Sequence, residues 1–257
     1  MVAAYRAALR EQLREASDPA KKAWWERYVK DGTPFIGVPM ARVRAIVHAW
    51  HRTTAGEGLD SRQQGDLALS LFNGEYTEEK LAGMVYLQEI LIPAGAVQCT
   101  REEDQFARLF TDGLICDWNV CDWFCVKVLG PLIEREGRAC AVRVSEWRTA
   151  ENLWQARASL VAFVNLANDR AYHPLIEESC EVLIRREERF AKTAVGWVLS
   201  EVGKHDPAFV RRVVRQNIEH FSAESLNSAI KRLGEEERTA FRRLRRGFRP
   251  GRPVVGR

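Results

Sequence analysis

The sequence predicts an all-α fold, specifically a HEAT-like helical-repeat solenoid. Apolar residues recur at the spacing of one helix face in nearly every stretch between turn signals, as Leu153, Ala156 and Leu160 do within 151–167. No pair of segments shows the alternation that is typical of paired β-strands. Helix-start signals also recur along the chain, so we expect helices of about 10 to 18 residues joined by short loops.

The start signals place individual helices. Asp18 precedes Pro19, Thr77 precedes two acidic residues, Asp206 precedes Pro207, and Ser222 precedes another helical pattern. Periodicity and these signals together predict roughly twelve to fourteen helices. Their approximate positions are 2–16, 19–31, 39–53, 61–72, 77–91, 102–112, 118–136, 138–148, 151–167, 172–188, 190–204, 207–219, 222–232 and 235–246.

The order of these helices favours a repeat architecture. Consecutive helix pairs follow each other every 35 to 45 residues or so, which is typical of solenoids in which each pair packs only against its neighbours. The pairs share little sequence identity, so a compact irregular bundle is the alternative. No long linker interrupts the helices, and we expect one domain over residues 1–240 followed by a basic, disordered tail over 241–257.

Positive charge is concentrated at the C-terminus. The chain of 257 residues has a net charge of +4, yet residues 242–257 contain seven arginines and no acidic residue. The remainder of the chain contains 32 basic and 35 acidic residues. A nucleic-acid-binding surface on the body must therefore be a local patch, and the tail is either a solubilising end or a contact to phosphates.

Several classes of protein and site are not indicated. No apolar run is long enough to span a membrane, and charges recur through the first residues, so we expect a cytoplasmic protein without membrane contact. P-loop, GxGxxG and GxSxG motifs are absent, and the pair His48 and His51 is typical of an exposed face, so we expect neither metal nor cofactor. No CxxC pair occurs, and we expect the cysteines to be buried apolar residues without disulfides; they are Cys99, Cys116, Cys121, Cys125, Cys140 and Cys180.

The candidate site residues lie in three helices. Trp118 and Asp122 are four residues apart and must share one helix face, Arg157 interrupts an apolar helix, and Trp197 follows Gly196. Each of them alone is most simply a structural residue. Together, a carboxylate, two indoles and a guanidinium suit a groove that holds a phosphodiester and a cationic nucleoside.

The segments around these residues resemble those of a known protein family. Over most of residues 5–235 the chain resembles the AlkC/AlkD-type DNA alkylation repair enzymes, which are DNA glycosylases built from HEAT-like repeats. The matching segments are ERYVKDGTPFIGV, DWNVCDW, ENLWQARAS, KTAVGWVLSEVGKHDP and SLNSAIKRL, in the family's order. The resemblance implies that Trp118 and Trp197 line a groove against the lesion, that Asp122 is the catalytic carboxylate, and that Arg157 contacts the DNA backbone. It also matches Tyr28 to an aromatic residue facing that groove, and retention of the tryptophans and the aspartate argues against the family's inactive paralogues.

Chemistry supports the same interpretation. A purine alkylated at N3 or N7 is cationic and leaves without protonation, so one carboxylate that stabilises an oxocarbenium-like sugar and positions a water is sufficient. Indole faces would select the cationic base by about 0.5–2 kcal/mol each, without flipping it into a tight pocket. Where the family often has a polar residue near DNA, this chain has Val38, Pro39 and Met40, which leaves open a wider entrance for bulky adducts.

The predicted function is thus hydrolysis of cationic alkylated purines from duplex DNA, by a monomer associated with the nucleoid. Lys192 and Lys231 are expected to contact phosphates, as basic surface residues near the groove. The alternative is a non-catalytic module that binds damaged or branched DNA, or a protein-binding scaffold.

Overall fold

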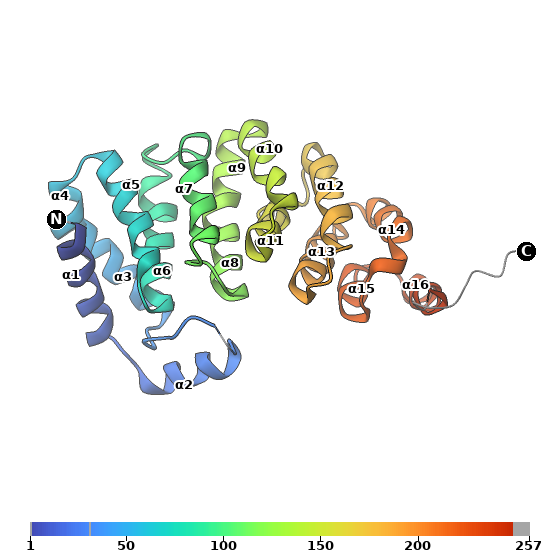
Figure 1. Cartoon of the computed structure of the whole chain (residues 1–257), viewed down its shortest axis with the longest axis horizontal. Helices are drawn as coiled ribbons and strands as arrows, with labels where there is room; N and C mark the ends of the chain where they lie inside the picture. The colour runs from blue at the N-terminus through green and yellow to red at the C-terminus, as the bar shows by residue number, and fades with distance from the viewer. Residues whose placement is uncertain (1, 31, 249–257) are drawn as a thin grey trace, which may run out of the picture. The chain divides into compact units, whose positions relative to one another are not determined.

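The computed structural model describes residues 2–30 and 32–248, and within them all regular secondary structure is helical (Figure 1). The chain forms two compact units, Met1–Arg143 and Val144–Arg257. None of the helices in the described ranges is long and apolar enough to cross a membrane. The predicted all-α fold is therefore confirmed.

In the first unit, α3, α6 and α8 form a row in which α6 contacts both of the others. All ten residues of α6 are buried, which identifies this helix as the centre of the unit. The elements are α1 (Val2–Glu15), α2 (Pro19–Tyr28), α3 (Met40–Trp50), η1 (His51–Ala55), α4 (Gly56–Gly58), α5 (Ser61–Ser70), η2 (Leu71–Asn73), α6 (Thr77–Tyr86), η3 (Leu87–Leu91), α7 (Cys99–Thr111), α8 (Trp118–Phe124), η4 (Cys125–Leu129), α9 (Gly130–Glu136) and α10 (Arg138–Glu146), which continues into the second unit.

The second unit repeats this arrangement. Helices α11, α13 and α15 form a row, and α12 and α14 pack against α13. The elements are η5 (Trp147–Thr149), α11 (Leu153–Val161), η6 (Val164–Leu166), η7 (Arg170–Tyr172), α12 (His173–Leu183), α13 (Arg189–Val202), α14 (Pro207–Gln216), η8 (Ile218–His220), α15 (Ala223–Ala229) and α16 (Glu235–Gly247). Stacked helix pairs with one helix of each in a common row are what a helical-repeat fold requires, and the prediction of such a fold is confirmed.

The predicted helix over 118–136 is one continuous run of three elements. It begins as α8, widens to π-helical geometry over Cys125–Leu129, and continues as α9. Pro131 follows this wide turn, and its missing amide N–H cannot close a bond to the carbonyl of Lys127. The proline therefore gives a local reason for the change of helical pitch just after the candidate site.

The polar first turn of α6 holds the loop that follows α2. The buried carboxylate of Glu78 accepts hydrogen bonds from the backbone N–H groups of Ile36 (2.8 Å), Gly37 (2.8 Å) and Val38 (3.0 Å). Thr77 reinforces this, because its hydroxyl donates to the carbonyl of residue 33. A buried carboxylate with three backbone donors fixes this loop against the centre of the unit.

The helix starts agree with the predicted signals, with one difference. Asp18, Asp206 and Ser222 each accept a hydrogen bond from a backbone N–H in the first turn of the following helix. Thr77 begins α6 as predicted, but it does not cap the helix, because its hydroxyl is used by the neighbouring loop.

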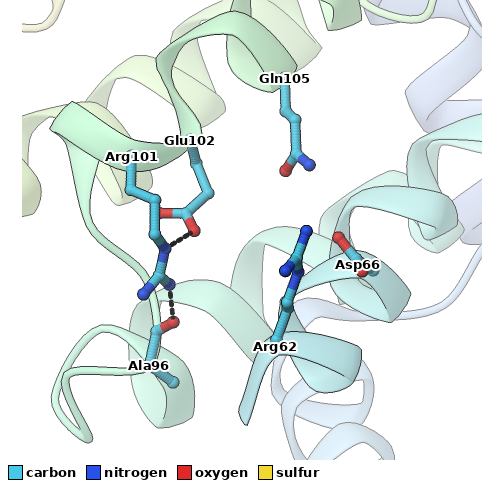
Figure 2. A pocket seen from close by; sticks show the side chains of 7 residues that line it. Arg62, Asp66, Ala96, Arg101, Glu102 and Gln105 are labelled. Carbon is cyan, nitrogen blue, oxygen red and sulfur yellow. Dashed lines mark hydrogen bonds and ion pairs between the residues drawn. The ribbon is translucent and has the colours of Figure 1, made fainter.

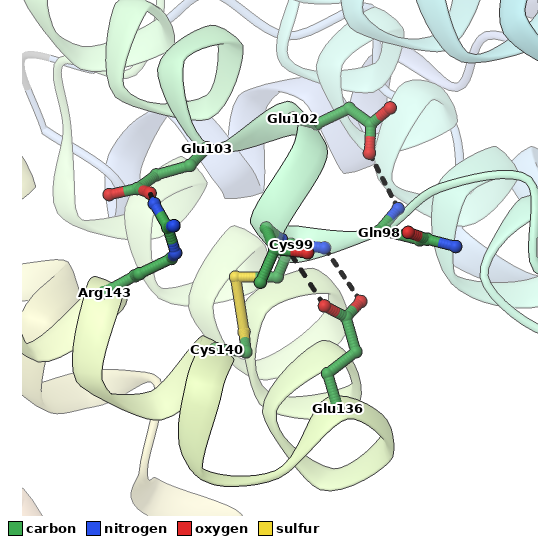
Figure 3. The surroundings of a disulfide bond; sticks show 8 residues. Gln98, Cys99, Glu102, Glu103, Glu136, Cys140 and Arg143 are labelled. Atoms are coloured by element: carbon green, nitrogen blue, oxygen red, sulfur yellow. Dashed lines mark hydrogen bonds and ion pairs between the residues drawn. A yellow bond between two sulfur atoms is a disulfide. The ribbon is translucent and has the colours of Figure 1, made fainter.

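The cysteine prediction was partly wrong. Cys99 and Cys140 form a disulfide, with their Cα atoms 5.7 Å apart, between the start of α7 and α10 (Figure 3). Beside it, Glu136 accepts a hydrogen bond from the N–H of Cys99 at 2.8 Å. The free cysteines are buried except Cys116, which is exposed. The two half-cystines are 41 residues apart, so only tertiary packing brings them together.

The C-terminal helix extends into the segment predicted to be a tail. Helix α16 ends at Gly247, so residues 241–247 are helical. Phe248 follows without regular secondary structure, and the remainder of the predicted tail, 249–257, lies outside the described residues.

Candidate functional site

The start of α8 is anchored by Asp117, a residue that sequence reasoning did not single out as structural. Its buried carboxylate accepts from the N–H of Val120 at 2.8 Å, which caps α8. It also accepts from the N–H of Thr33 at 2.9 Å and from the Thr33 hydroxyl at 2.8 Å. Asp117 therefore joins the loop after α2 to the helix that carries Trp118 and Asp122.

This junction brings Tyr28 and Trp118 together. Their ring centroids are 5.5 Å apart and the rings meet edge to face. Tyr28 also stacks on Trp24, with centroids 5.3 Å apart and an interplanar angle of 11°. The side chain of Tyr28 is 58% exposed and that of Trp24 is 46% exposed, so the first unit has an open aromatic surface beside α8.

Asp122 lies on the same side of α8 as Trp118. Both residues are partly exposed, whereas the intervening Asn119, Val120 and Cys121 are buried. The ammonium group of Lys127 lies 5.8 Å from the ring centroid of Trp123, the residue that follows Asp122 on α8. The first unit thus gathers three of the predicted residues, Tyr28, Trp118 and Asp122, around one partly exposed surface.

In the second unit, Arg157 is buried between α11 and α13. Its side chain is only 4% exposed, and Nη1 donates to the carbonyl of Phe190 at 2.6 Å and to the hydroxyl of Thr193 at 3.3 Å. Trp197 follows Thr193 by four residues on α13 and is partly exposed. Arg157 therefore binds α13 at Phe190 and Thr193, about one turn before Trp197, and positions the start of that helix.

Gly196 lies where α13 packs closely against α15. A Cβ atom there would lie 2.6 Å from the carbonyl oxygen of Ser225 and 3.0 Å from Cβ of Ser228. Only glycine permits α15 to approach α13 so closely. The approach sets which faces of α13 remain open, among them the side that carries Trp197.

The two predicted lysines lie at opposite ends of the α13–α15 pair. Lys192 Nζ donates to the carbonyl of His220 at 2.9 Å, near the start of α13. Lys231 is exposed, and its neighbour Arg232 approaches Gly203 at the end of α13. Two other arginines of this unit are ion-paired, Arg211 with Glu237 and Arg212 with Glu177.

The side chains of His48 and His51 contact different partners and do not form a common site. His48 Nε2 lies 2.8 Å from Glu89, whereas His51 Nδ1 lies 3.3 Å from the Tyr86 hydroxyl. Burial and the neighbouring positive charge of His48 lower the pKa of His51. Among residues 2–30 and 32–248, no three His, Cys, Asp or Glu side chains are grouped so that they could hold a metal ion.

A cavity of about 370 Å³ between α5 and α7 contains none of the predicted residues (Figure 2). Charged side chains line it, and one of them, Arg101, donates to the carbonyl of Ala96 and to the neighbouring Glu102. The lining residues are Arg62, Gly65, Asp66, Ala96, Arg101, Glu102 and Gln105. The candidate site is thus an open aromatic and acidic surface, distinct from this polar cavity.

Comparisons with known proteins agree with this fold. A solved structure described as "Predicted DNA alkylation repair enzyme from Enterococcus faecalis" is similar with a TM-score of 0.72 and 15% sequence identity, over 85% of this chain and 97% of that chain. At this identity the likeness concerns the fold alone. A comparison with curated proteins found no match. Residues 9–233 match the family described as DNA alkylation repair enzyme. Because this match spans most of the sequence, the chain belongs to the DNA alkylation repair enzyme family.

Proposed function

We propose that the protein is a monofunctional DNA glycosylase that hydrolyses the N-glycosidic bond of cationic alkylated purines in duplex DNA. Its substrates would be N3-alkyladenine and N7-alkylguanine, with bulky adducts included. The observation that carries this proposal is the partly exposed carboxylate of Asp122 beside Trp118, in a chain of the DNA alkylation repair enzyme family. The protein would act as a monomer on nucleoid DNA in the cytoplasm, through one repeat domain over residues 1–240, without metal or cofactor.

The proposed reaction needs one carboxylate. The bond between C1′ and the alkylated purine breaks with its electron pair moving to the base, which leaves neutral. The sugar becomes oxocarbenium-like, and the negative charge of Asp122 stabilises it. A water molecule then bonds to C1′ and gives up a proton to solvent or to the carboxylate, and an abasic site remains.

Aromatic side chains supply selectivity for the cationic base. Trp118 and Tyr28 are in contact, and each indole or phenol face near a cation contributes about 0.5–2 kcal/mol that a neutral base does not gain. Trp24 extends this surface, because it stacks on Tyr28 and is itself exposed. A surface that selects by charge and remains open accepts larger adducts more readily than a closed pocket does.

The second unit is proposed to contribute to DNA binding. Trp197 offers a partly exposed indole, and Lys192 and Lys231 offer positive charge to phosphates. Arg157, which the resemblance assigns to the DNA backbone, is buried in the described structure. We propose that it supports binding chiefly by holding the first turn of α13, which carries Lys192 and leads to Trp197.

The test is release of modified base from duplexes that carry N7-methylguanine, N3-methyladenine or a bulky N3-adenine adduct. Asp122→Asn should lose nearly all turnover and keep its DNA affinity, because the substitution removes the charge and little volume. Asp104→Asn is the matched control, since Asp104 is exposed on α7 and undergoes the same chemical change. No release by the wild-type protein from any duplex, with DNA binding retained, would support a non-catalytic DNA-binding module. Absence of salt-dependent DNA binding would favour a protein scaffold.

A further inference from the structure

A basic cavity in the second unit lies outside the candidate site. Its volume is about 410 Å³, and it is bordered by α13, the segment after η8, and the end of α16. A smaller hollow beside it, of about 90 Å³, shares two of its arginines, Arg245 and Arg246. Figure 1 shows α16 next to α15 in this unit, in agreement with their contacts.

The cations of this cavity are held in place without being neutralised. Lys192 Nζ donates to the carbonyl of His220 at 2.9 Å, and Arg245 Nε donates to the carbonyl of Phe221 at 2.6 Å. Carbonyl oxygens orient a cationic side chain but carry no net charge. In the part of the chain that the structure describes, Arg245 and Arg246 have no carboxylate at ion-pair distance.

Other arginines of the same unit differ in this respect. Arg189 binds Glu224 through two hydrogen bonds of 2.8 and 2.6 Å, and Arg212 binds Glu177 in the same bidentate manner. Within the cavity the acidic residue is Glu219, whose carboxylate lies 3.4 Å from the ring of His220. Positive charge is therefore in excess around the end of α16.

The sequence of α16 concentrates this charge on one side. Phe241 is its buried residue. Arg242, Arg245 and Arg246 are spaced three and four residues apart and share one face of the helix, and Arg242 on this face is ion-paired with Glu235. Basic residues in a last turn stabilise a helix by about 0.3–1 kcal/mol each through the helix dipole. That effect accounts for one or two of them, but it does not require Lys192, the cation that borders the cavity from α13.

We propose that Lys192, Arg245 and Arg246 form a binding site for the phosphodiester backbone of duplex DNA. The inference rests on the proposed function, which supplies the DNA. Lys192 precedes Trp197 by five residues, or about 7.5 Å along the helix axis. Duplex DNA carries a phosphate every 3.4 Å or so along each strand, so a strand that passes Trp197 and Lys192 presents further phosphates to α16. The contact is to phosphates, and binding through it is independent of base sequence.

The experiment measures binding of undamaged DNA to the full chain. The double variant Arg245→Gln and Arg246→Gln is compared with wild type on a duplex of about three helical turns (~30 bp). Loss of two phosphate contacts should lower the slope of log affinity against log salt by about 1.8. At 0.1 M salt it should weaken binding of this duplex by up to about 60-fold.

Matched controls isolate the position of the charge. Arg185→Gln with Arg215→Gln removes two exposed arginines elsewhere in the same unit and should leave the affinity near wild type. Arg245→Lys with Arg246→Lys keeps the charge and should retain most of the affinity. The proposal is overturned if the two double Gln variants bind the duplex equally, or if single-stranded RNA loses more affinity than duplex DNA. Failure of the proposed glycosylase activity is a separate result, since it requires that wild type release no base.

Discussion

The loop that joins α2 to α3 should depend on Glu78. Its carboxylate is 1% exposed and accepts three backbone N–H groups, those of Ile36, Gly37 and Val38. Glu78→Gln keeps the size of the side chain. One of its two acceptor oxygens becomes an NH₂ group, which at the Oε2 position would face the N–H of Ile36.

The expected cost follows from these bonds. A hydrogen bond to a charged group contributes about 1.5–3 kcal/mol, and a neutral one about 1 kcal/mol. The variant loses one charge-assisted bond outright and weakens the other two, so we expect the loop to be destabilised by about 3–5 kcal/mol. Because 1.4 kcal/mol corresponds to a factor of ten, the amides of residues 36–38 should exchange with solvent at least about 100-fold faster.

Amide hydrogen exchange with residue resolution measures this directly. Glu75→Gln is the control, because Glu75 is exposed and lies just before α6. Release of N7-methylguanine should also fall in the Glu78 variant, since the same loop leads from Tyr28 to α3. Exchange at residues 36–38 that stays within tenfold of wild type would refute the proposed role of Glu78.

Three further outcomes are expected. Gly196→Ala should destabilise the second unit by at least about 1–3 kcal/mol in urea unfolding, because the new Cβ would meet the Ser225 carbonyl at 2.6 Å; an unchanged midpoint would contradict this account. The hydrogen bond from the Phe209 N–H lowers the pKa of Asp206 below its ordinary value of 3.8, so its stabilisation is present above about pH 4 and is lost as the pH falls through the lowered pKa. Asp206→Ala should thus cost about 0.5–2 kcal/mol at pH 7 and less at pH 3, whereas an equal cost at both pH values would rule out the charged cap. Tyr28→Ala should reduce release of cationic bases about 2- to 30-fold while Tyr28→Phe retains most of it, and equal losses in both would point to the hydroxyl rather than the ring.

The helices could be predicted because their determinants are local. Asp18, Asp206 and Ser222 cap helices with side chains that reach two or three residues along the chain, and a run such as 118–136 shows its periodicity within a few turns. The division of that run by a π-helical turn before Pro131 was not predicted, because the apolar pattern continues through it.

The contacts that organise the candidate site are long-range and were missed. Asp117 and Thr33 are 84 residues apart, and Glu78 is about 40 residues from the amides that it binds. A buried acid followed by an apolar helix is a weak signal for such a contact, because a cap looks the same in sequence. The disulfide between Cys99 and Cys140 escaped prediction for the same reason, since spacing alone does not report proximity.

The sequence by itself determined the all-α class, the positions of the helices, the family, and the shared helix face of Trp118 and Asp122, because periodicity, capping and motif order are properties of short segments. Only the tertiary structure decided that Tyr28 meets Trp118, that Arg157 is buried against α13, and that Lys192 and Arg245 are held by carbonyl oxygens. These features depend on which helices pack together. Packing is the sum of many contacts between distant residues, none of which is encoded by the spacing of residues along the chain.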